Sequence, residues 1–150
     1  MIKLYLAGPC DSDHRTLMEH IARYIESHYP NFEVYKPWTL KIENAWDYPQ
    51  EEWARKVFIA DKNAIDECDI MIVISLGRIS SAGTNWEQGY AYGTEKIVYV
   101  IQLGDVPTSL MTFCGSDYFT NSAEDMPSIE HAIDTALFAR SRNTCTTTLT

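Results

Sequence analysis

The sequence predicts a single α/β domain built on an open, doubly wound and mostly parallel sheet of about five strands. Apolar runs that suit strands alternate along the chain with segments of helical period, as they do in parallel α/β folds. The clearest run, Ile70 to Leu76, is rich in β-branched residues and suits a strand covered on both faces. The domain is expected to span residues 1–142, followed by a tail over 143–150.

The same patterns predict the other elements in order. Strands are expected at 2–7, 32–35 and 96–103, and helices from Asp11, Ser12 or Asp13 to about His28, over 50–67, from Thr84 onward, and from Asp125 or Ser128 to about Arg140. Gly8 and Pro9 end the first strand, because proline cannot donate to a sheet ladder. Residues 104–116 are expected to form a loop with an apolar insert.

Aromatic residues mark the chain between the second and third predicted strands. Residues 37–49 carry Trp38, Trp46 and Tyr48 without a clear period, as in a lid over a flat ligand or in side chains packed beneath a long loop. The following helix is expected to face the core with a stripe of Trp53, Val57, Ala60, Ala64, Phe58 and Ile65. Asp61 falls inside this arc, so it is either an edge residue or a functional one.

Composition excludes several classes of protein. The formal charge of −9 argues against polymeric nucleic acid as a partner, because phosphate backbones are held mainly by clustered lysines and arginines. No stretch approaches membrane-spanning length, and a reducing cytoplasm is the expected location. The four cysteines are scattered and the histidines form no ligand motif, so neither a disulfide framework, nor a metal, nor any other cofactor is expected.

The segment after the strand ending at Leu76 combines small residues, a helix start and one carboxylate. It lies at the carboxyl end of a strand, where open α/β sheets bind ligands. Thr84 and Glu87 match a capping box, in which Glu87 only satisfies backbone amides. A catalytic Glu87 is the alternative, and the local pattern leaves both interpretations open.

Tyr5, Asp61 and Glu87 are expected to converge at the carboxyl edge of the sheet. Two separated carboxylates with a phenol nearby suit cleavage at an acetal-like carbon. One carboxylate attacks, and another group manages the proton of the leaving group.

The sequence resembles the nucleoside 2-deoxyribosyltransferase family over roughly residues 2–118. The resemblance is carried by Tyr5-Leu6-Ala7-Gly8-Pro9, by Asp61 with Ala64-Ile65 and Cys68-Asp69-Ile70, by Gly83-Thr84-Asn85-Trp86-Glu87-Gln88-Gly89-Tyr90-Ala91, and by Leu110-Met111. It implies a flavodoxin-like fold and attack of Glu87 on C1′ of a nucleoside or nucleotide. It also implies that Tyr5 orients Glu87 and that Asp61 hydrogen-bonds the base and shuttles its proton. The substrate contacts that it implies are Gly8, Ser81, Gly83, Ser109 and Met111.

Two departures from the family pattern bear on the substrate. Family members that use nucleosides carry an aspartate where this chain has Ser81 and an asparagine where it has Ser109. Hydroxyl groups can donate to a phosphate without adding negative charge, and the related 2′-deoxynucleoside 5′-monophosphate N-glycosidases carry serines at both positions. Asp11 and Asp13 in the first loop carry negative charge, which disfavours a phosphate nearby. Ser12, Arg15 and Arg78 are the candidate phosphate ligands.

The sequence therefore predicts an enzyme that cleaves the N-glycosidic bond of a (2′-deoxy)nucleoside 5′-monophosphate through Glu87. A nucleoside 2-deoxyribosyltransferase acting on unphosphorylated nucleosides is the first alternative. A non-catalytic nucleotide-binding module, with Glu87 as a cap, is the second. The resemblance further implies a homodimer or larger homo-oligomer, because the residue matching Ser109 comes from a neighbouring subunit.

Overall fold

A computed structural model describes the backbone of residues 1–143 and the side chains of residues 1–138. Its centre is one parallel sheet of five strands, as the sequence predicts, and the strand order is β2-β1-β3-β4-β5. The strands are β1 (Ile2–Ala7), β2 (Phe32–Tyr35), β3 (Ile70–Ser75), β4 (Ile97–Leu103) and β5 (Tyr118–Ser122). The helices are α1 (Arg15–His28), α2 (Gln50–Glu67), α3 (Ala82–Gly93), α4 (Leu110–Cys114) and α5 (Met126–Asn143).

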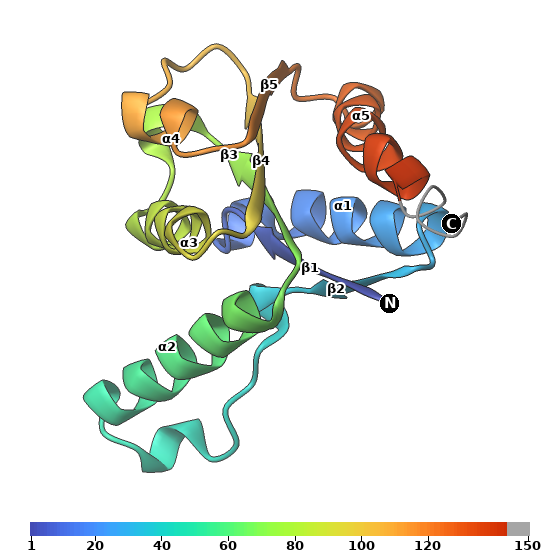
Figure 1. Cartoon of the computed structure of the whole chain (residues 1–150). Coiled ribbons are helices and arrows are strands. Elements are labelled where there is room, and N and C mark those ends of the chain that lie inside the picture. The colour runs from blue at the N-terminus through green and yellow to red at the C-terminus, as the bar shows by residue number, and fades with distance from the viewer. Residues whose placement is uncertain (144–150) are drawn as a thin grey trace.

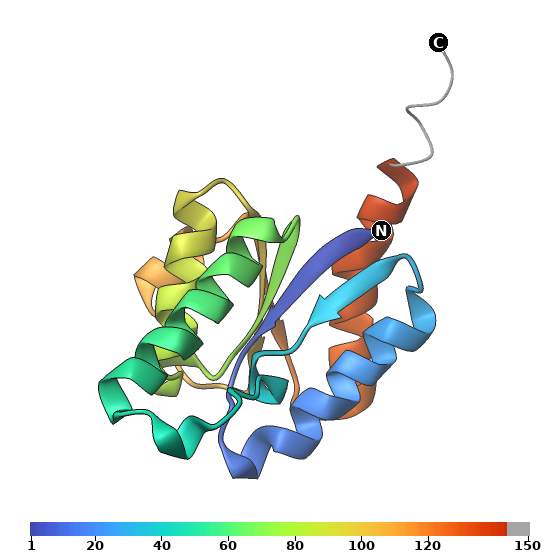
Figure 2. The same cartoon turned by 90° about the horizontal axis from the view of Figure 1, so that it is seen from below.

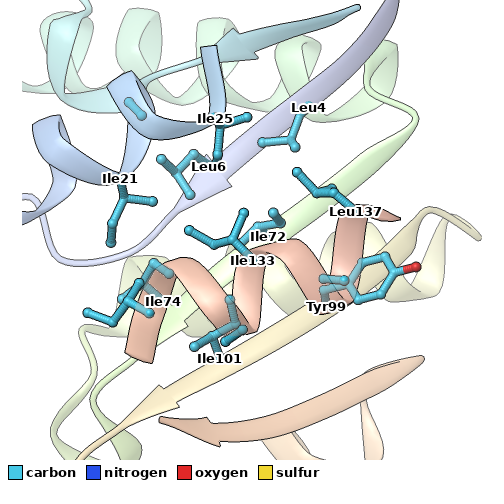
Figure 3. Packing of buried hydrophobic residues seen from close by; sticks show 14 of the residues in the cluster. Leu4, Leu6, Ile21, Ile25, Ile72, Ile74, Tyr99, Ile101, Ile133 and Leu137 are labelled. Atoms are coloured by element: carbon cyan, nitrogen blue, oxygen red, sulfur yellow. The ribbon is translucent and has the colours of Figure 1, made fainter. Parts of the chain in front are cut away.

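Helices cover both faces of the sheet, with α1 and α5 on one side and α2, α3 and α4 on the other (Figures 1 and 2). Alternate strand residues point to opposite layers. Leu4, Leu6 and Ile72 pack with α1 and α5 in the larger core (Figure 3). Tyr5 and Ala7 belong to the second core, on the side of α2 and α3. This alternation places the Tyr5 ring on the same side of the sheet as Glu87 of α3.

The strand order creates a switch point between β1 and β3. The chain leaves β1 toward β2 on one side and returns through α2 to β3 on the other side. The connections after β1 and β3 therefore diverge at the carboxyl ends of these two strands, which is where doubly wound sheets bind ligands. Tyr5 and Gly8 come from the first of these strand ends, and Ser81 and Glu87 follow the second.

Several element boundaries differ from the predictions. The strand over 118–122 was not assigned from sequence, because β5 is an edge strand in which only Ser122 is buried. The expected loop over 104–116 contains α4, and α3 begins at Ala82 rather than Thr84. At the other end of the chain, α5 runs past Arg140 to Asn143, and the rest of the predicted tail, 144–150, lies outside the described residues.

The predicted stripe of α2 faces the core only in part: Ala64 packs against the second core, while Val57 and Ala60 are half-buried. Ile65 is the one buried residue of this helix, whereas Trp53 and Phe58 are 42% and 47% exposed. The reason is the position of the helix, whose N-terminal half extends past the sheet (Figure 1).

Before this helix, Trp38 packs against the core and donates to Glu19 Oε1 at 2.7 Å, while Trp46 is exposed. None of the helices within the described residues is long and apolar enough to cross a membrane.

Candidate active site

The loop between β3 and α3 is shaped by its own hydrogen bonds. Ser80 Oγ accepts from the backbone N–H of Leu76 at 2.7 Å, and Ser75 Oγ accepts from that of Gly77 at 3.1 Å. Gly77 has φ +68°, and a Cβ there would lie 2.9 Å from the carbonyl oxygen of Val106. Only glycine fits this turn without strain, and the turn fixes where α3 begins.

Ser81 is the N-cap of α3. Its hydroxyl oxygen accepts from the backbone N–H of Thr84 at 3.2 Å. The predicted capping box of Thr84 and Glu87 is therefore wrong, because the helix starts one turn earlier than expected. Thr84 instead donates its hydroxyl to the carbonyl oxygen of Gly8 at 3.1 Å, and it thereby ties α3 to the end of β1. No backbone N–H of the described residues donates to the Glu87 carboxylate, so this side chain is not a cap.

Glu87 and Tyr5 meet beneath the start of α3. Burial raises the pKa of Glu87 to about 7, and the nearby charge of Asp61 adds to the rise. Tyr5 is fully buried, and its hydroxyl has no hydrogen-bond partner among the described residues. It approaches the Glu87 carboxylate without reaching ordinary hydrogen-bond geometry, and its polarity partly opposes the rise in the pKa of Glu87. Burial, followed by the charges of Glu87 and Asp61, raises the pKa of Tyr5 well above its ordinary value.

Asp61 reaches the same site from α2. Burial raises the pKa of this half-buried carboxyl group. The Tyr35 hydroxyl donates to Asp61 Oδ1 at 2.9 Å and opposes the rise, because the bond favours the ionised form. The structure thus brings together Tyr5, Asp61 and Glu87 from β1, α2 and α3.

Sequence reasoning missed Tyr35 and Cys10 as members of this site. Tyr35 pairs in register with Tyr5, so aligning the first two predicted strands side by side would have shown it. Cys10 lies in the loop after β1, and its thiol donates to the carbonyl oxygen of Gly8 at 3.5 Å. Burial, followed by the charges of Glu87 and Asp61, raises the pKa of Cys10; Arg15 opposes that rise. No sequence pattern indicates Cys10 as a site residue. It lies in the site because the loop that carries it follows the end of β1 there.

Two predicted glycines also border the site. A Cβ on Gly83 would lie 4.0 Å from Glu87 Oε1 and 3.9 Å from Ser81 Oγ, so this glycine sits beside both side chains. A Cβ on Gly8 would come within 2.7 Å of Met18 Cε and 3.2 Å of Ile74 Cβ. Glycine at this position therefore lets the end of β1 approach the neighbouring strand and helix closely.

Ser109 and Met111 do not meet Glu87 within one chain. They line a separate groove of about 610 Å³ with Gln88, Gly89, Tyr92 and Gly115 among its walls, and Glu87 is absent from its lining. Met111 is 82% exposed, and Ser109 caps α4 by accepting from the backbone N–H of Met111 at 3.2 Å. A larger hollow of about 850 Å³ lies at the ends of β4 and β5, and Tyr5, Asp61 and Glu87 are not among the residues that line it.

The described residues hold no cluster of three or more potential metal ligands. Cys10, Cys68 and Cys114 are free thiols, while Cys145 lies outside the described part of the chain. In the first loop, His14 Nδ1 pairs with the Asp11 carboxylate at 2.8 Å. This hydrogen bond lowers the pKa of Asp11.

The fold and the site define a class of protein. A doubly wound α/β domain presents a carboxylate with a pKa near neutrality beside a phenol and a second carboxyl group, an arrangement suited to displacement at a sugar carbon. The family model described as nucleoside 2-deoxyribosyltransferase matches residues 4–109, so the chain belongs to this family and is an enzyme of glycosyl transfer. The match includes Tyr5, Asp61, Glu87 and Ser81, and it ends at Ser109.

Solved structures share the fold at low sequence identity. The 2-deoxyribosyltransferase of Bacillus psychrosaccharolyticus is 23% identical with a TM-score of 0.68, over 85% of this chain and 90% of that one. A CMP N-glycosidase of Clostridium botulinum is 18% identical with a TM-score of 0.61, over 88% and 98%. A conserved protein of Enterococcus faecalis is 16% identical with a TM-score of 0.72, over 91% and 99%. No curated protein sequence matches the chain at a significant level.

Replacing Glu87 by glutamine is expected to stabilise the protein at alkaline pH. With a folded-state pKa of about 7 against an ordinary 4.5, the folded chain binds the carboxyl proton more tightly than the unfolded chain does. That stabilisation is complete below pH 4.5 and is lost as the pH rises through 7. Glutamine stays neutral, so the free energy of unfolding should rise by about 1–3 kcal/mol near pH 8 and change little near pH 4.

Chemical denaturation at the two pH values measures this difference. Glu43→Gln, in the exposed loop before α2, is the control and should leave stability unchanged at both. Equal stability of the wild type and Glu87→Gln near pH 8 would contradict burial as the cause of the raised pKa.

Proposed function

We propose that this enzyme cleaves the N-glycosidic bond of a (2′-deoxy)nucleoside 5′-monophosphate through Glu87 and releases the base to water or exchanges it for another. The observation that supports the proposal is the environment of the Glu87 carboxylate and its pKa. This carboxylate is not used as a helix cap, it is close enough to Tyr5 and Asp61 for both to act on its pKa, and that pKa of about 7 leaves a large ionised fraction at neutral pH. The family to which the chain belongs supports the reaction class.

The proposed reaction has two displacements at C1′ of the sugar. The ionised Glu87 carboxylate attacks C1′, the bond from C1′ to the base nitrogen breaks, and its electron pair leaves with the base. Asp61, whose pKa is raised by burial, supplies the proton that the departing nitrogen needs. Water then attacks C1′ of the glycosyl ester, the bond from C1′ to the Glu87 oxygen breaks and frees the carboxylate, and the attacking water gives a proton to the ionised Asp61. In base exchange a second base attacks C1′ in place of water.

Serine at position 81 favours a phosphorylated substrate. Ser81 lies at the start of α3 beside Gly83, close to the Glu87 carboxylate. A carboxylate here would repel a 5′-phosphate, whereas a hydroxyl adds no charge. Arg15 is the better supported candidate cation, because its charge already acts on Cys10 in the site. A relative in fold is named as a CMP N-glycosidase, which is consistent with a nucleotide substrate.

We also propose that the site is completed by a second copy of the chain. Within one chain Ser109 and Met111 line a groove whose walls do not include Glu87, and Leu110 and Met111 are 79% and 82% exposed. Along the adjacent face of α3, Gly89 and Gly93 leave open space around their α-carbons. A partner's helix can approach such a face closely, and a two-fold arrangement would carry each chain's Ser109 to the other chain's site.

Monophosphates are expected to react at least about 10-fold faster than the matching nucleosides, and Ser81→Asp should reverse the preference by repelling the phosphate. Release of free base, with and without an acceptor base, measures both rates. Aspartate and asparagine are good N-caps, so α3 should be retained in Ser81→Asp and in the neutral control Ser81→Asn. Faster reaction of nucleosides in the wild type would favour the nucleoside 2-deoxyribosyltransferase alternative.

Glu87→Ala should abolish turnover while the protein stays folded, because Glu87 caps no helix. Wild-type enzyme quenched during turnover should carry a sugar ester on the peptide containing Glu87, detected by mass spectrometry. Glu43→Ala is the control and should remain active. Turnover retained by Glu87→Ala would remove this residue from the mechanism, and absence of turnover in the wild type would favour the non-catalytic binding module.

Mixing two inactive variants tests whether the site is shared. Glu87→Ala lacks the nucleophile, and Ser109→Asp should repel the phosphate while still capping α4. If Ser109 serves the partner's site, randomly mixed dimers should recover roughly a quarter of the wild-type rate, because about half are mixed and each of these holds one complete site. A mixture no more active than its components would contradict the shared site.

A further inference from the structure

Two tyrosines occupy matching places on neighbouring strands of the site. Tyr5 on β1 and Tyr35 on β2 pair in register, and their rings stack with centroids 5.1 Å apart at 25°. The hydroxyl of Tyr5 lies beside Glu87, and the hydroxyl of Tyr35 donates to Asp61 Oδ1 at 2.9 Å. Each of the two carboxylates of the site therefore faces its own tyrosine.

The position of the Asp61 carboxyl group depends on Tyr35, because the packing of α2 does little to fix it. The N-terminal half of α2 extends past the sheet, and Ile65, one turn after Asp61, is its one buried residue. The bond from Tyr35 is the one hydrogen bond that the Asp61 side chain makes among the described residues. Packing alone does not fix this carboxyl group, because one turn of helix allows it several rotamers.

We propose that Tyr35 is a positioning residue for the N-glycosidic reaction proposed above: it holds Asp61 in the site so that its carboxyl group can protonate the departing base. The bond to Oδ1 leaves Oδ2 as the oxygen that exchanges the proton. Tyr35 itself need not touch the substrate, since it acts through Asp61.

The electrostatics of the site agree with this role. Asp61 is within range of ionisable groups on four elements: Tyr35 on β2, Tyr5 on β1, Glu87 on α3 and Cys10 in the first loop. Of these, Tyr35 is the group that lowers the pKa of Asp61 against the effect of burial. Loss of its hydroxyl should therefore raise that pKa further and leave the carboxyl group free to rotate.

Tyr35→Phe removes the hydroxyl and keeps the ring that stacks on Tyr5. We expect kcat for a purine deoxynucleotide to fall about 10- to 100-fold, the size expected for losing a hydrogen bond to a charged group. The alkaline limb of the pH profile should move to higher pH. A substrate carrying 7-methylguanine should be nearly unaffected, because that base leaves as a neutral molecule without receiving a proton.

Tyr29→Phe is the matched control. It also removes one tyrosine hydroxyl bonded to an aspartate, Asp134 at 2.6 Å, but on the α1 and α5 side of the sheet. It should leave kcat and the pH profile unchanged. In an Asp61→Asn background, adding Tyr35→Phe should cause little further loss, since the two residues act as one unit.

Equal losses on the purine and 7-methylguanine substrates, or an unchanged kcat and pH profile in Tyr35→Phe, would overturn the positioning role and leave the proposed function standing. A wild-type enzyme inactive on both substrates would overturn the proposed function, and the positioning role with it. The two failures are therefore distinguished by the wild-type rate.

Discussion

The hydrogen bond from the Thr84 hydroxyl to the Gly8 carbonyl is the contact on which the site depends. It joins the first turn of α3 to the end of β1 across the switch point of the sheet. Because Glu87 is one turn further along α3 and Tyr5 lies just before the end of β1, this bond sets how the two side chains approach each other. Ser81 and Gly77 act on the same geometry by fixing where the helix begins.

The site is organised around carboxyl groups removed from water. Burial is the largest cause of the raised pKa of both Glu87 and Asp61. A neighbouring tyrosine hydroxyl lowers the pKa of each and so opposes part of the effect of burial. An aspartate or glutamate in water would be ionised at neutral pH and would be a poor acid. Here burial brings the pKa of Glu87 to about 7 and raises the pKa of Asp61, so in the proposed reaction Glu87 attacks in its ionised form while Asp61 gives up a proton.

The sequence was most informative where one pattern sets both the structure and the chemistry. The apolar run from Ile70 to Leu76 predicted β3. The places of Tyr5, Asp61 and Glu87 in the predicted fold, together with the family motifs, predicted that the three would meet. Periodicity did not reveal β5, because an exposed edge strand lacks a buried pattern. It placed Trp53 in the core because a helical stripe shows which residues share a face, but not whether a sheet lies beneath them. The register of β1 and β2 places Tyr35 beside Tyr5, and it follows only when the two predicted strands are aligned with each other. The contact of Thr84 with Gly8 depends on how α3 packs at the end of β1, which no local pattern encodes.

The sparse packing of α2 divides the site into a rigid part and an adjustable part. Tyr5 is fully buried in the second core and Glu87 is mostly buried beside it, where a shift in one side chain disturbs several others. Asp61 stands on a helix with one buried residue, Ile65, and its own side chain is held by the hydroxyl of Tyr35. In the proposed reaction, substitutions along α2 would reshape the side that meets the base while the groups beside the sugar stay the same. A fold arranged in this way could acquire new base preferences without a change at Glu87, the proposed nucleophile.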